Sequence, residues 1–422
     1  MDKSKAKEGY LIGRQPILNL KDEMIAYELY FRSTSGPSRP EQGNSEISRT
    51  MANGIINIVS RFGLVQILGS CKGLIKADSE LILGDVIELL PKERMILELP
   101  GTLTLTPELL KRCQSLKEAG FEFSFDDHDY NPGFEPLYPV VQIVKIHPFR
   151  QSTEQLTESV KKFRAYPVKL LAEKVETREE YLQCRGLGFD LFQGFFFAKP
   201  SVIEKKPMDE AASSLFKLMR LLSEDAEMDA IEKVFRGSSV LTYKLLLLVN
   251  SVALGLRQKV ETVRHALAIV GRQKLQRWVQ LALFASEDAK GMENPLVDMA
   301  AVRATLMEQL ASSHPALRGN RDSIDQAYMI GMLSLFESQY KITLDEMVSS
   351  LNLSETIKDA LSPKRGGILG QLLELAELME NPGSWVTADQ LADLQLREED
   401  VLAAQMKAFS WLGELSPAGS RS

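Results

Sequence analysis

Short β-rich apolar runs alternate with helical stretches over the first 200 residues, and this alternation constrains the fold more than any other feature. Eight strands separated mainly by helices within about 200 residues are typical of a small (β/α)8 barrel. The first two runs lie only a few residues apart, which predicts a hairpin and therefore one antiparallel strand. The eight runs cover residues 11–18, 24–31, 73–77, 94–100, 121–127, 141–147, 168–175 and 191–198.

The rest of the chain is patterned almost entirely for helices, with amphipathic periodicity from about residue 211 to residue 380. A turn-rich stretch at 198–210 is the best candidate for a linker between the strand-and-helix half and the helical half. We therefore predict an α/β barrel domain over 1–203 and an all-helical domain over 204–422.

Composition narrows the classes of function. A formal net charge of -7 disfavours a basic nucleic-acid binder, and four histidines are too few for a metal site built mainly on imidazole. The three cysteines form no CxxC pair, which predicts a reducing compartment. With neither a signal-peptide pattern nor an apolar run long enough to cross a bilayer, we expect a cytoplasmic protein without membrane contact.

Polar side chains stand at or near the ends of most predicted strands. In such a barrel the C-terminal strand ends meet on one face, where catalytic groups gather. Several acids without histidine suit Mg²⁺, Mn²⁺ or Ca²⁺, and two such ions activate water against a phosphodiester. A set of purely structural acids is the alternative, and the pattern alone leaves both open. The residues are Glu28, Lys76, Glu98, Asp126, Asp127, Lys145, Glu173 and Gln193.

Seven motifs in this region resemble, in the right order, the EAL domain of cyclic di-GMP phosphodiesterases. They are RQPI (14–17), AYELYFR (26–32), MILELP (95–100), SFDD (124–127), VKI (144–146), LAEKVET (171–177) and FQGFFFAKP (192–200). The resemblance implies a TIM-like barrel and, in active members, a two-metal hydrolysis of cyclic di-GMP to pGpG. It assigns metal binding to Glu28, Glu98, Asp126 and Asp127, catalysis to Lys145 and Glu173, and ligand contacts to Gln15, Arg32, Glu176 and Gln193.

Departures from the EAL pattern concentrate on the metal site. Lys76 replaces the asparagine ligand, and a protonated ammonium group has no lone pair to offer a metal ion. Gly101 falls where the family has a glutamate that anchors the loop after the fifth strand, and that loop reads DDHDYNPGFEP. We expect a pseudo-enzyme that requires no cofactor, with Mg²⁺ or Mn²⁺ needed only if the site is functional. Within the loop, we expect His128 and Asp129 to be a solvent-exposed pair rather than metal ligands.

The helical half resembles the HDOD domain, a relative of metal-dependent HD phosphohydrolases, through residues 240–255, 263–279 and 327–338. Where HD enzymes carry a His-Asp doublet, this chain has Ser334 and Leu335. A hydroxyl and an isobutyl group cannot hold a metal ion, so we expect no hydrolysis by this half.

The EAL-like barrel followed by an HDOD-like domain resembles a bacterial signalling arrangement, the YuxH-type family. We expect a signal-transduction regulator that acts by binding a ligand or a protein. The alternative is an active Mg²⁺- or Mn²⁺-dependent cyclic di-GMP phosphodiesterase regulated by the helical half. The expected partners are an unidentified signalling protein and cyclic di-GMP; nucleic acid is disfavoured, and homodimer formation is left open.

Overall fold

A computed structural model describes residues 10–33, 64–194, 210–238, 262–284, 295–335, 353–381 and 384–415, together with 241, 242, 245 and 249. The end of the predicted eighth strand, 195–198, lies outside the described residues.

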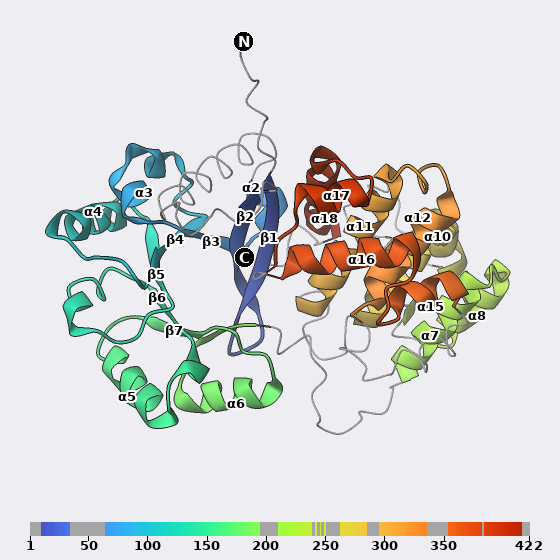
Figure 1. Cartoon of the computed structure of the whole chain (residues 1–422). Coiled ribbons are helices and arrows are strands. Elements are labelled where there is room, and N and C mark those ends of the chain that lie inside the picture. Colours follow the sequence, from blue (N-terminus) through green and yellow to red (C-terminus); the bar gives the residue numbers. More distant parts are fainter. Residues whose placement is uncertain are drawn as a thin grey trace, which may run out of the picture. The chain divides into compact units, whose positions relative to one another are not determined.

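Eight strands close into a barrel in sequence order (Figure 1). The first strand is antiparallel to both of its neighbours, and every other neighbouring pair is parallel. The predicted barrel, its hairpin and its single antiparallel strand are therefore confirmed. The strands are β1 (Tyr10–Asn19), β2 (Met24–Ser33), β3 (Lys72–Lys76), β4 (Met95–Pro100), β5 (Glu122–Asp126), β6 (Ile143–Ile146), β7 (Lys169–Ala172) and β8 (Leu191–Gln193).

Helices connect the parallel strands, and their starts are set by side chains that accept the first backbone N–H groups. Thr106 accepts from Leu109 N–H, while Ser152 and Thr177 form capping boxes. The helices of this region are α2 (Leu64–Leu68), α3 (Ser79–Leu83), η1 (Asp85–Leu89), α4 (Pro107–Glu118), η2 (Pro132–Phe134), η3 (Pro148–Arg150), α5 (Thr153–Phe163) and α6 (Arg178–Leu187).

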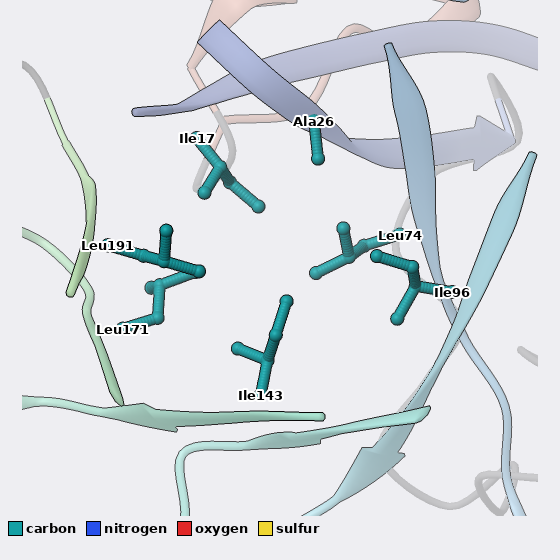
Figure 2. Packing of buried hydrophobic residues seen from close by; sticks show 7 residues of the cluster. All are labelled: Ile17, Ala26, Leu74, Ile96, Ile143, Leu171 and Leu191. Atoms are coloured by element: carbon teal, nitrogen blue, oxygen red, sulfur yellow. The ribbon is translucent and has the colours of Figure 1, made fainter. Parts of the chain in front are cut away.

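A layer of apolar side chains fills the barrel interior, and most of the polar residues predicted for the site lie one layer above it. The side chains in Figure 2 come one from each strand except β5 and point toward one another. Because side chains two residues apart on a strand share a face, the residues two positions further on also point inward. Glu28 follows Ala26 in this way, as Lys145 follows Ile143. The apolar layer comprises Ile17, Ala26, Leu74, Ile96, Ile143, Leu171 and Leu191.

The rest of the described chain is helical, as predicted. Helix α10 has a break at Gly271, whose φ is 70°. Gly331 lets α12 pack closely on α11, because an added Cβ would lie 2.7 Å from the Cα of Ala304. None of the described helices is both long and apolar enough to cross a membrane. The helices are α7 (Glu210–Ser223), α8 (Met228–Arg236), α10 (Val263–Phe284), α11 (Pro295–Ser313), α12 (Arg321–Leu333), α15 (Glu355–Leu361), α16 (Gly367–Glu380), α17 (Ala388–Asp393) and α18 (Glu398–Leu415).

The chain divides into two compact units. The first comprises Met1–Ser201 with Leu375–Met406, and the second comprises Val202–Glu374 with Lys407–Ser422. Within the first unit, Gln405 accepts from the backbone N–H of Ile12 at 3.2 Å and donates to its carbonyl at 2.7 Å. The predicted boundary at 203 and 204 lies outside the described residues and stays a prediction.

Candidate functional site

The site is centred on Lys145, which is buried in the middle of the barrel with 1% of its side chain exposed. Its Nζ lies 2.8 Å from Glu28 Oε2, 2.8 Å from Glu98 Oε1 and 3.1 Å from Asp126 Oδ1. Glu173 Oε2 is 4.0 Å away. The fold thus brings together five of the predicted residues, contributed by β2, β4, β5 and β6 and by the position that follows β7.

A second ammonium group approaches the same acids from β3. Lys76 Nζ lies 2.8 Å from Asp126 Oδ2, and its side chain is 43% exposed. The two oxygens of Asp126 therefore each face a different lysine. Burial lowers the pKa of Lys76, but attraction by Asp126, Glu98 and Glu28 outweighs it, so the pKa is raised and Lys76 is a cation at neutral pH.

The protonation of the acids follows from burial and from these two cations. Burial opposes the charge of Asp126 and Glu28, yet Lys145 and Lys76 outweigh it, so the pKa of Asp126 falls to about 2 and that of Glu28 is lowered. Burial and the charge of Glu28 raise the pKa of Glu98 to about 8. At neutral pH the cluster therefore holds Glu98 mainly as a neutral acid beside two ionised carboxylates.

Hydrogen bonding in the cluster is uneven. Lys145 approaches Glu98 outside hydrogen-bond geometry, so within the described part of the chain both Glu98 oxygens lack a hydrogen-bond partner, as does Glu173 Oε1. Buried oxygens of this kind are costly unless something donates to them. They are the polar groups that the site has left for a ligand or a water molecule.

Amide and phenol groups from β1, β2 and β8 flank the acids. Gln193 Nε2 donates to Glu28 Oε2 at 2.6 Å and to Gln15 Oε1 at 2.9 Å, and the Tyr30 hydroxyl donates to Gln15 Oε1 at 3.1 Å. Both donors meet the oxygen of Gln15, so its amide N–H groups are the part left to contact a ligand. Tyr30 was not predicted to take part; its position two residues after Glu28, on the same face of the strand, could have identified it.

Asp127 is separated from the other acids. Its backbone has a φ of 47°, and its carboxylate accepts two hydrogen bonds from Arg150, one of them 2.7 Å long. Arg150 ends η3 and was not singled out from the sequence.

Arg32 and Glu176 are the two remaining predicted ligand contacts. Arg32 belongs to β2, opposite Leu11, and its side chain lies outside the described residues. Glu176 is exposed, and its backbone N–H donates to Glu180 Oε2 at 2.6 Å.

The arrangement does not fit a divalent metal ion. The carboxylates of Glu28 and Asp126 face ammonium groups, which repel a cation, and Asp127 faces a guanidinium group. In the described segments, no group of three or more His, Cys, Asp or Glu side chains is placed to hold a metal ion.

The expectation of an exposed His128–Asp129 pair is wrong for His128. Its imidazole is buried, stacks on Phe125 with ring centroids 4.2 Å apart, and lies 3.1 Å from the Tyr138 hydroxyl. Asp129 is exposed. The physical reason is the aromatic surroundings, since Phe134 and Phe163 also pack against the imidazole.

In the helical half, Ser334 at the position of the missing His-Asp doublet takes part in two hydrogen bonds. Ser334 Oγ accepts from Arg303 Nη1 at 2.8 Å and donates to the Gly331 carbonyl at 2.7 Å. Arg303 and Leu335 are buried. These contacts join α11 to the end of α12 and provide no metal ligand.

Comparison with known proteins gives matches to both halves of the chain. The HDOD domain family matches residues 209–336. A Vibrio cholerae protein named cyclic di-GMP phosphodiesterase CdgJ is 29% identical over 411 residues, covering 96% of this chain and 93% of its own length. The Bacillus subtilis protein YuxH is 27% identical over 416 residues, covering 96% and 99%. A crystal structure of an EAL domain protein from Listeria monocytogenes EGD-e covers 45% of this chain and 87% of its own at 19% identity, with a TM-score of 0.36.

Proposed function

Because the chain joins an EAL-type barrel to an HDOD domain, we propose that it is a bacterial signalling regulator that acts by binding and lacks efficient cyclic di-GMP hydrolysis. The observation that carries this proposal is the position of Asp126 between Lys76 and Lys145. In a two-metal hydrolase a carboxylate at this place would hold a cation that activates water. Here its charge is already neutralised by side chains, which supply no nucleophile.

The ligand class that the barrel suits best is a cyclic dinucleotide. Half-exposed Lys76 supplies a positive charge for a phosphate group, and Gln15, which bonds Gln193 on the flank of the acids, supplies amide donors. The name of the Vibrio cholerae relative, a cyclic di-GMP phosphodiesterase, supports cyclic di-GMP as the particular dinucleotide. Binding through these groups needs no metal ion.

The helical half then acts on a protein partner. Its Ser334–Arg303 contact is a hydrogen-bonded packing element between two helices, without the groups that a metal-dependent hydrolase requires. A signalling protein is the partner class that such a chain serves.

Calorimetric titration of the full chain with cyclic di-GMP, with and without Mg²⁺, tests the proposal when followed by an assay for pGpG. We expect binding that is equal in the two conditions and no product. Gln15→Ala should weaken the binding. Gln142→Ala is the control and should not weaken it, because the Gln142 side chain bonds the backbone of Phe123 in β5 and of Val140 before β6. Failure to bind in both conditions would refute the ligand assignment and leave protein binding as the function.

A second candidate is an active Mg²⁺- or Mn²⁺-dependent cyclic di-GMP phosphodiesterase. It is favoured by the convergence of Glu28, Glu98, Asp126, Lys145 and Glu173, and by the name of the relative CdgJ. Formation of pGpG that requires Mg²⁺ or Mn²⁺ and disappears in Glu28→Ala would establish this function and exclude the pseudo-enzyme.

A further inference from the structure

We propose that Lys76 and Arg150 are two separate counter-cations that keep the Asp126–Asp127 doublet from presenting both carboxylates to one divalent ion. The inference rests on the proposed function and deepens it by assigning metal exclusion to two particular side chains. It also implies that replacing Lys76 alone does not restore a metal site.

The two acids of the doublet contact different cations. Asp126 ends β5 and points into the barrel, where Lys145 and Lys76 contact its two oxygens. Asp127 follows in the left-handed backbone region and turns its carboxylate to Arg150. Two parallel hydrogen bonds from a guanidinium group engage both oxygens of a carboxylate, so Asp127 has no oxygen free of this contact.

A close approach of the backbone holds Asp127 in this orientation. A Cβ added at Gly101 would lie 2.5 Å from the Asp127 carbonyl oxygen and 2.7 Å from that of Asp126. Only glycine leaves room for these two carbonyls at the end of β4. The position at which EAL domains carry an anchoring glutamate is thus occupied by the backbone of the acidic doublet itself.

The next residue fixes the loop from the other side. The backbone N–H of His128 donates to the Lys145 carbonyl at 2.9 Å, and its buried imidazole stacks on Phe125. Asp127 therefore lies between two fixed points, and rotating its side chain toward Asp126 requires first breaking the contact with Arg150.

Binding of Mn²⁺ to the purified full chain, measured by electron paramagnetic resonance, tests the proposal without any assay of activity. The variants are Lys76→Asn, Arg150→Ala and the double variant. Both side chains are about half exposed, at 43% and 47%, so the variants should fold, which circular dichroism checks. Arg164→Ala is the matched control, because Arg164 pairs with Asp190 at 3.1 Å with similar exposure but outside the doublet.

We expect Mn²⁺ binding in the double variant only, or binding at least about fivefold tighter there than in either single variant, as the loss of an exposed ion pair predicts. Equal affinity of Lys76→Asn and the double variant would overturn the role of Arg150 and leave the proposed function intact. Absence of binding in every variant would also overturn the proposal, because something other than the two cations would then exclude the ion. Tight Mn²⁺ binding by the wild type would overturn it as well, and dinucleotide binding would still be decided by the separate titration.

Discussion

Replacing Lys145 with methionine should destabilise the barrel strongly. Methionine keeps an unbranched chain of similar length and removes only the charge and its hydrogen bonds. The change removes from the buried carboxylate of Glu28 its contact with a cation, while the hydrogen bond from Gln193 remains, and it takes one of two ammonium groups from Asp126. Removing one partner from a buried ionic network costs about 3–5 kcal/mol in the free energy of unfolding.

Lys72→Met is the matched control. Lys72 contacts Glu122 at 2.7 Å, close to the 2.8 Å between Lys145 and Glu28, but the side chains of Lys72 and Glu122 are 38% and 36% exposed. Solvent screens such a pair, so the control should cost no more than about 1 kcal/mol. The difference between the two substitutions isolates the effect of burial.

The penalty of Lys145→Met should depend on pH. The folded-state pKa of Asp126, about 2, lies below its ordinary 3.8, so its stabilising contribution is complete above 3.8 and is lost as pH falls toward 2. Without Lys145, burial raises the pKa of Glu28 and Asp126 relative to the wild type. The acids are then protonated more readily at low pH, so the difference from wild type should be large at pH 8 and smaller at pH 5.

Urea unfolding followed by far-UV circular dichroism at the two pH values measures the effect, since urea adds no ions to screen the pairs. Adding Glu28→Gln to Lys145→Met should recover part of the loss, because the buried charge is then removed with its partner. A loss within about 1 kcal/mol of the Lys72→Met control at pH 8 would refute the claim that Lys145 neutralises buried carboxylates.

Two further predictions concern Gly101, which packs against the start of the loop after β5, and His128 within that loop. Gly101→Ala should lower the free energy of unfolding by about 1–3 kcal/mol, because the added Cβ overpacks the site. Gly186→Ala is the control, since nothing lies within 4 Å of its added Cβ, and thermal unfolding should show no such loss for it. Burial lowers the pKa of His128 from 6.5 to about 4, so the wild type should lose stability as pH falls from 6.5 to 4. The loss is about 1.4 kcal/mol per pH unit. His128→Phe keeps the stacking on Phe125 and removes the titrating group. Its melting temperature should therefore change less between pH 6.5 and pH 4 than that of the wild type. An unchanged pH dependence would show that other groups cause the loss of stability.

The polar layer of the barrel was predictable because strand periodicity is local. Once Glu28, Glu98 and Lys145 are assigned to strands of one closed sheet, the alternation of side chains places them on the inner face at one end. The sequence motifs therefore predicted the inward-facing acids and Lys145, and the structure adds the distances that place Lys145 at the centre of them.

The separation of Asp126 from Asp127 depends on features that the sequence does not encode locally. Neighbouring residues on an extended chain point to opposite faces, which warns against treating the doublet as one ligand pair. The partner of Asp127, however, is Arg150, 23 residues away in a short helix after β6. The burial of His128 likewise depends on Phe134 and Phe163, which come from η2 and α5.

The charges of the cluster bear both on whether a metal ion can bind and on which ligand can bind. At neutral pH, Glu28 and Asp126 are balanced by Lys145 and Lys76, and Glu98 is mainly protonated. A divalent ion would thus enter a site with little net negative charge, and its electrostatic gain would be small. Lys76→Asn removes one positive charge and the loss of Arg150 frees one carboxylate, so together the changes supply the two charges that one such ion requires.

The same balance determines how a phosphate ligand can bind. Lys145 is enclosed by its carboxylates, so Lys76, with 43% of its side chain exposed, is the cation of this cluster that a phosphate can reach. A phosphate on Lys76 must compete with Asp126, which accepts from the same ammonium group at 2.8 Å. Dinucleotide binding should therefore weaken with rising salt by about the slope of one ion pair, and Lys76→Met should remove that dependence. In the proposed function, this one ion pair between Lys76 and the ligand, rather than a metal ion, holds the phosphate.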